Sequence, residues 1–241
     1  TLSDNYSAFN KNNKVFNESM MESVITLQKL GVSTDASTKT MDFFHRTMGM
    51  AGEEAAAMAT NILASGDAIS VSSAQMAANF ETAKNTIVEF GSRGINVFND
   101  LAAQAKASGV AMADLIKVAE NFDTFADAAK HTAKLNAVLG TNLSAIKMIN
   151  AEHGERINIL RDEINFQVGA FDGLDRYTKK LIAQQMGVGS VAEAQRLLNM
   201  STEEYLENQN NLDNFAKTTA ELKEQAMKLV PILEQISVAF N

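Results

Sequence analysis

The chain has 241 residues and a net charge of −8, and 46% of its residues are hydrophobic and 21% charged. These values are typical of a globular protein and exclude a wholly disordered chain or a collagen-like fibre. Cysteine is absent, which excludes disulfides, thiolate nucleophiles and cysteine-ligated metal sites. The acidic balance repels phosphate backbones, so we expect no sequence-specific nucleic-acid partner.

The composition also predicts the fold class. The chain has one proline, and alanine fills about one position in seven. Because proline interrupts helices and alanine favours them, we predict an all-α protein. No apolar run reaches about twenty residues, so we expect no membrane span in this segment. The sequence starts without methionine or a signal peptide, and we expect it to be a segment of a longer chain.

The first predicted element is one long helix over residues 4–30, which places an N-terminal region at 1–32. Glycine then marks the joints of a central multi-helix domain, predicted at 33–200. Gly31, Gly109 and Gly187 suit the left-handed position that follows a helix, and a serine or an early acidic residue suits the start of the next. The helices predicted between the joints are 35–48, 53–65, 73–90, 95–108, 112–121, 125–139, 145–150, 155–168, 174–186 and 191–198.

The last predicted element is a long C-terminal helix over residues 201–241. Ser201 and Glu204 fit a capping box at its start. From Leu212 onward, apolar or small residues alternate at spacings of three and four, a heptad pattern held for about four heptads that predicts a coiled coil. The residues of this face, which we predict as an oligomer interface, are Leu212, Phe215, Thr219, Leu222, Ala226, Leu229, Leu233, Ile236 and Phe240.

Two alternatives stay open for this helix. An amphipathic helix docked on its own domain would show a similar pattern, and the residue types on the face do not discriminate a dimer from a trimer. Pro231 falls at an outward position of the heptad, where it would kink the helix without blocking the face.

No residue pattern in the sequence indicates a catalytic, metal-binding or cofactor-binding site. His45, His131 and His153 stand in no metal-ligand or catalytic pattern, and the chain has no zinc motif, phosphate-binding loop, dinucleotide fingerprint or nucleophile elbow. We therefore expect no enzyme, no catalytic residue, no metal site and no cofactor.

Three blocks of the sequence carry a resemblance. They are FDTFADAAKHTAKLNAVLG at 122–140, GERINILRDEI at 154–164 and GAFDGLDRYTKKLIAQQMG at 169–187. In order and spacing they resemble tail tape-measure proteins of large contractile-tailed bacteriophages, although Thr141 stands where that family often has a second glycine. The matching residues are Phe122, Asp123, Phe125, Leu135, Asn136, Ala137, Leu139, Gly140, Glu155, Arg156, Leu160, Arg161, Arg176, Lys179, Ala183 and Gly187.

The resemblance implies a structural virion component that sets tail-tube length, anchors at the baseplate hub and leaves the tail before DNA. It also implies a homo-oligomer with threefold matching to the hub, tail-tube and hub proteins as partners, and a place in the tail lumen or hub after assembly in the host cytoplasm. The alternative is a soluble helical adaptor or effector that binds a partner helix.

Overall fold

The computed structural model describes the backbone of residues 14–239 and the side chains of residues 17, 18 and 20–221. All regular elements in this range are helical and none is a strand, which confirms the all-α prediction. The expected helix over 4–30 is described only as α2 (Lys14–Lys29), because its earlier residues lie outside the described range.

The helices predicted within 33–200 all appear, and most of their ends differ by no more than two residues. One difference is at 43–48, where a π-helical turn (Phe43–Thr47) follows α3 in place of continued α-helix. The remaining helices in chain order are α3 (Thr34–Asp42), α4 (Gly52–Ala64), α5 (Ser73–Phe90), α6 (Gly94–Ser108), α7 (Met112–Glu120), α8 (Phe125–Leu139), α9 (Ala145–Asn150), α10 (His153–Val168), α11 (Arg176–Met186), α12 (Val191–Leu198) and α13 (Thr202–Ala239).

The glycine joints adopt the backbone conformation that the sequence predicts. Gly31, Gly109 and Gly187 have φ angles of 84°, 66° and 82°. Only glycine adopts this left-handed region without a steric cost from Cβ. At Gly187 a Cβ atom would also lie 2.0 Å from Nδ2 of Asn121 and displace that side chain, which donates a hydrogen bond to the Met186 carbonyl.

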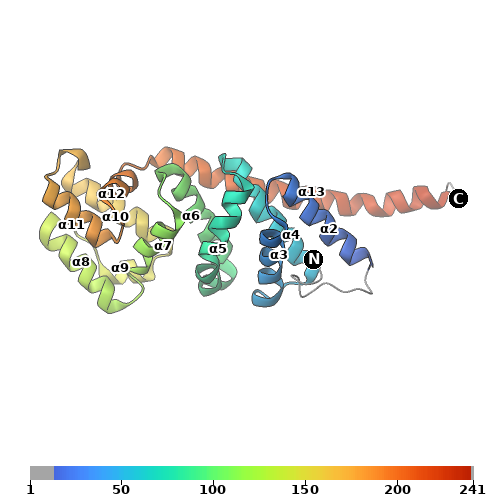
Figure 1. Ribbon diagram of the computed structural model, residues 1–241, viewed down its shortest axis with the longest axis horizontal. Helices are drawn as coiled ribbons and strands as arrows, with labels where there is room; N and C mark the ends of the chain where they lie inside the picture. The colour runs from blue at the N-terminus through green and yellow to red at the C-terminus, as the bar shows by residue number, and fades with distance from the viewer. Residues whose placement is uncertain (1–13, 240–241) are drawn as a thin grey trace. The chain divides into compact units, whose positions relative to one another are not determined.

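Contacts divide the chain into two compact units. The first comprises Thr1–Met76 and Asn210–Asn241, and the second comprises Ala77–Gln209. The predicted central region 33–200 therefore contributes helices to both units. Helices α5 and α13 each run across a unit boundary as continuous ribbons (Figure 1).

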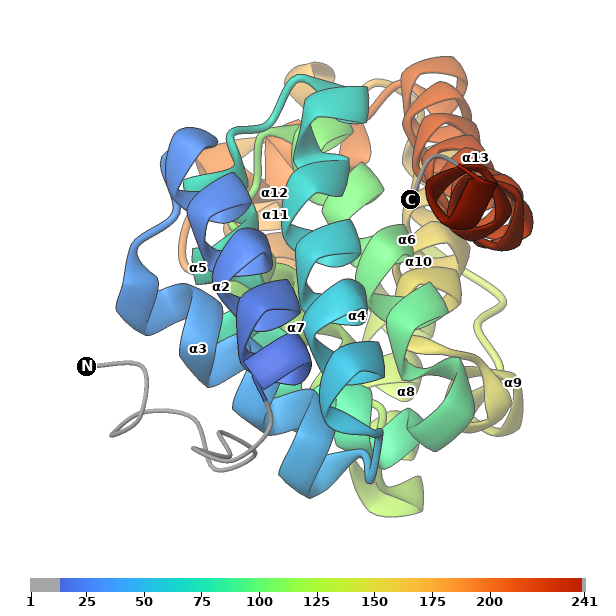
Figure 2. The same ribbon diagram turned by 90° about the vertical axis from the view of Figure 1, so that its right-hand side faces the viewer.

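The first unit is built on α2, α3 and α4, which pack side by side (Figure 2). Each helix has an apolar stripe that must be buried, and the three stripes meet in a shared core. Its fully buried large side chains include Met20, Leu27, Met41, Phe44 and Leu63.

The second unit contains α5 from Ala77 onward, α6 to α12 and the first turns of α13. Helix α10 contacts α6, α7, α8 and α12, which makes it the central helix of the unit. In its core, the rings of Phe80 and Phe98 meet edge to face with centroids 5.8 Å apart. Such pairs add specific geometry to the apolar burial that holds the helices together.

Candidate functional site

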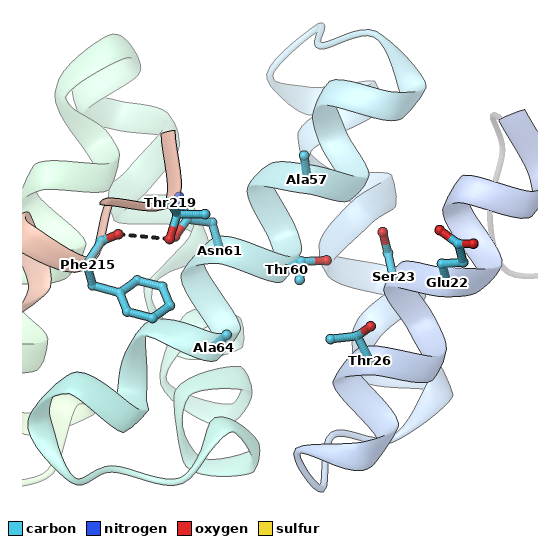
Figure 3. Close-up of a pocket in the computed structure, with 9 residues that line it drawn as sticks. All are labelled: Glu22, Ser23, Thr26, Ala57, Thr60, Asn61, Ala64, Phe215 and Thr219. Atoms are coloured by element: carbon cyan, nitrogen blue, oxygen red, sulfur yellow. Dashed lines mark hydrogen bonds between the residues drawn. The ribbon is translucent and has the colours of Figure 1, made fainter. Parts of the chain in front are cut away.

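The predicted interface face of α13 starts inside the protein. Leu212 is fully buried, and Phe215 and Thr219 are half-buried. Phe215 and Thr219 lie beside α4, and the Thr219 hydroxyl donates a 2.8 Å hydrogen bond to the Phe215 carbonyl (Figure 3). The described start of the heptad face is therefore covered in part by the chain itself.

An open hollow of about 380 Å³ lies where these residues meet α2 and α4. Its wall on α4 carries Ala57, Thr60, Asn61 and Ala64, and Figure 3 shows the Phe215 ring near Ala64. The other residues that line it are Glu22, Ser23, Thr26 and Thr219. The small side chains on the α4 wall leave this space open between the helices.

For the rest of the predicted face the structure describes the helix backbone. Helix α13 continues through these positions to Ala239, so the backbone keeps the register that the heptad pattern requires. The side chains of Leu222, Ala226, Leu229, Leu233 and Ile236 lie outside the described ones, and Phe240 lies outside the described residues altogether.

Each of the three histidines has its own surroundings, and none forms a hydrogen bond with another. Nδ1 of His45 lies 2.8 Å from the Met50 carbonyl, and Nδ1 of His131 lies 3.1 Å from the Gln185 carbonyl. Burial lowers the pKa of His131. His153 is 1% exposed, and neither of its ring nitrogens has a hydrogen-bond partner among the described residues.

The surroundings of His153 keep it neutral. Its ring meets Phe90 edge to face with centroids 5.2 Å apart. Burial, and next the positive charge of Arg156, lower its pKa to about 4. Because no catalytic or metal-ligating partner faces it, the group acts as a packed ring in the core.

A buried polar cluster joins α6, α10 and the first turns of α13. The Tyr205 hydroxyl donates a hydrogen bond to Asp100, and Nε2 of Gln104 donates one of 2.8 Å to the Gly154 carbonyl. Burial and the nearby Asp100 carboxylate raise the pKa of Tyr205 to about 12. This cluster attaches the start of α13 to the second unit through hydrogen bonds, which the sequence pattern did not indicate.

Arg156 is the most heavily bonded side chain of the resembling blocks. It is 5% exposed, pairs with Asp123, and donates to the carbonyls of Met148 at 2.8 Å, Ala119 at 2.9 Å and Ile149 at 3.1 Å. A buried guanidinium needs such partners to offset its lost hydration. Its role is to tie together α7, α9 and α10.

Asn136 and Thr141 define the turn after α8. Oδ1 of Asn136 accepts bonds from the Thr141 hydroxyl at 2.7 Å and the Leu143 backbone at 2.9 Å, and its Nδ2 donates to the Leu143 carbonyl at 2.9 Å. The hydroxyl of Thr141 thus adds a bond that a glycine there would lack. Both residues hold the backbone, so this block is structural in this chain.

No group of His, Asp and Glu side chains in the described part of the chain could hold a metal ion. Within residues 14–239, no helix has both the length and the hydropathy that a membrane crossing needs. No protein-family model, no curated protein and no solved structure matches the chain.

Proposed function

We propose that the chain is part of a tail tape-measure protein, a structural component of a phage tail. In this role it sets tail-tube length, anchors at the baseplate hub together with tail-tube proteins, and is released before DNA leaves. The observation that carries the proposal is α13, a helix of 38 residues with heptad spacing over its last two thirds. At about 1.5 Å per residue it spans roughly 57 Å, which suits a protein that acts through its length.

The three resembling blocks support the same function independently of α13. Several of their matching residues lie in the core or at a joint of the second unit: Phe122, Leu135 and Leu160 are fully buried, and Gly187 has a positive φ. We propose no enzyme activity and no cofactor for the chain. We place it in the virion, in the tail lumen or hub, as a homo-oligomer in which threefold matching to the hub favours a trimer.

The proposal is tested in the phage that encodes the chain. Deleting residues 217–230 from the gene removes two heptads and should shorten the tail by about 21 Å, while duplicating them should lengthen it by about the same distance. Electron cryo-microscopy of purified particles measures both. Tails of unchanged length in both mutants, or purified tails that lack the chain by mass spectrometry, would contradict the proposal.

A second candidate is a helical adaptor or effector that binds a partner helix. The observation in its favour is the burial of Leu212, because the start of the heptad face is covered within a single copy. Light scattering separates the two candidates. A monomer at micromolar concentration favours the adaptor, and a homo-oligomer that persists at high salt favours the tape-measure protein.

A further inference from the structure

The second unit carries a basic face on α11. Arg176, Lys179 and Lys180 follow one another at spacings of three and one, so they share one side of the helix. Together with Val191 at the start of α12 they line an open hollow of about 410 Å³. Arg176 and Lys180 are exposed, and neither forms an ion pair with any described residue. Two cationic groups therefore lie beside the hollow and Val191 without an ionic partner among the described residues.

The third basic residue is held in place. Nζ of Lys179 donates a 2.8 Å hydrogen bond to the Asp172 carbonyl and lies 5.8 Å from the centroid of the Phe171 ring. These contacts fix the long side chain along one wall of the hollow. Tyr177, which is 74% exposed, adds an aromatic surface beside the same helix turn. Tyrosine and arginine are among the residues enriched in protein interfaces.

The same unit carries an acidic face on the first turns of α13. Glu203, Leu206 and Glu207 lie on the side opposite the buried Tyr205 and Asn208. The two glutamates are exposed and unpaired among the described residues, and Leu206 is 46% exposed. This face therefore presents an apolar side chain beside two negative charges.

The two faces are complementary in charge and in spacing. Arg176 and Lys180 are four residues apart, as are Glu203 and Glu207, so each pair stands one helical turn apart. Leu206 lies beside the acidic pair, and the hollow lies beside the basic residues. Within one copy both faces are exposed, so neither covers the other. We infer that the basic face of α11 binds the acidic face of α13 on a second copy of this chain.

A second copy fits the basic face better than a nucleic acid does. A phosphate backbone brings negative charge but no apolar group for the hollow, whereas the acidic face of α13 brings two carboxylates together with the exposed Leu206. The inference does not rest on the proposed function, and this interface is separate from the heptad face.

The interface has a defined symmetry and salt dependence. It joins two different surfaces, so repeated contacts produce a ring or an open chain of copies. Its ion pairs are exposed, and salt screens them, since the Debye length falls from about 10 Å at 0.1 M to about 3 Å at 1 M. Association through this interface should therefore weaken as salt is added.

Disulfide cross-linking tests the contact directly, because the natural chain has no cysteine. Full-length K180C and E207C are mixed at low salt and oxidised with dissolved oxygen, and the covalent dimer is measured on a non-reducing gel. We expect several times more heterodimer from this mixture than from K180C with E221C, whose cysteine lies farther along the same helix. Equal yields from the two mixtures would overturn the inference.

Charge reversal provides the second test. We expect R176E/K180E and E203K/E207K each to weaken the salt-sensitive association at least tenfold in sedimentation velocity, with unchanged circular dichroism. An equimolar mixture of the two variants should restore it, because each then supplies the charge that the other lost. Unchanged association in both variants would overturn the inference. So would tight binding of a single-stranded oligonucleotide by the natural chain that R176E/K180E abolishes.

Discussion

At the residue scale, His153 should make the protein less stable in acid. Its pKa is about 4 in the folded chain against an ordinary 6.5, so the unfolded chain binds more protons between these values. Stability is therefore lost as the pH falls from about 6.5 towards 4, by about 2–3 kcal/mol at pH 4.5. H153L should remove this part of the pH dependence, as measured by urea denaturation at pH 7.5 and pH 4.5. Parallel losses in both proteins would contradict this assignment.

Arg156 offers a second test at this scale. R156M leaves Asp123 and the carbonyls of Met148 and Ala119 without their donor, and we expect a loss of about 3–5 kcal/mol. R196M is the matched control, because Arg196 is exposed and donates one 3.0 Å bond to the Gly109 carbonyl. We expect that change to cost less than about 1 kcal/mol. If urea denaturation gives similar losses of unfolding free energy for the two variants, burial does not determine how much Arg156 contributes to stability.

The sequence predicted single residues well where local geometry decides. Gly31 and Gly187 were assigned to helix ends, and both have positive φ. The pairing of Arg156 with Asp123 joins residues 33 positions apart, so it depends on the tertiary fold and no spacing rule reveals it. The same holds for Tyr205 and Asp100, 105 positions apart.

At the scale of elements, the helical spacing of apolar residues predicted the positions of most helices. Apolar residues recurring at helical spacing predicted α5 and α8 with their observed bounds. The π-helical turn at Phe43–Thr47 was missed, because its aromatic and polar residues also suit a continued α-helix. For Leu212 the heptad pattern left two alternatives open, a coiled coil with other copies or a helix docked on its own domain. Periodicity does not state what covers a buried face.

Helix α13 supports a prediction about assembly that concerns the later heptads. L229K places a charge on the predicted face, and we expect it to lower the mass of the oligomer by light scattering, because a buried lysine at that position is costly. E224K is the matched control, since Glu224 shares the outward heptad position of Pro231. An equal loss of mass in both variants would show that the predicted face is not the interface.

At the scale of the whole molecule, the two contact units differ in continuity. The second unit is one stretch, Ala77–Gln209, whereas the first combines the early helices with the chain from Asn210 onward. Sequence patterns predicted the helices but not this grouping, because it brings the chain from Asn210 onward together with helices far away in the sequence. Local periodicity carries no information about partners so distant in the chain.

This arrangement predicts that truncation acts on one unit alone. A chain that ends at Gln209 keeps Tyr205 and its bond to Asp100, but it loses Leu212, Phe215 and Thr219 from the first unit. We expect faster amide hydrogen exchange in α2 and α4, because they lose apolar neighbours, and unchanged protection in α10. Hydrogen exchange with mass spectrometry measures both regions in one experiment. Equal loss of protection in α10 would mean that the two units unfold as one cooperative body.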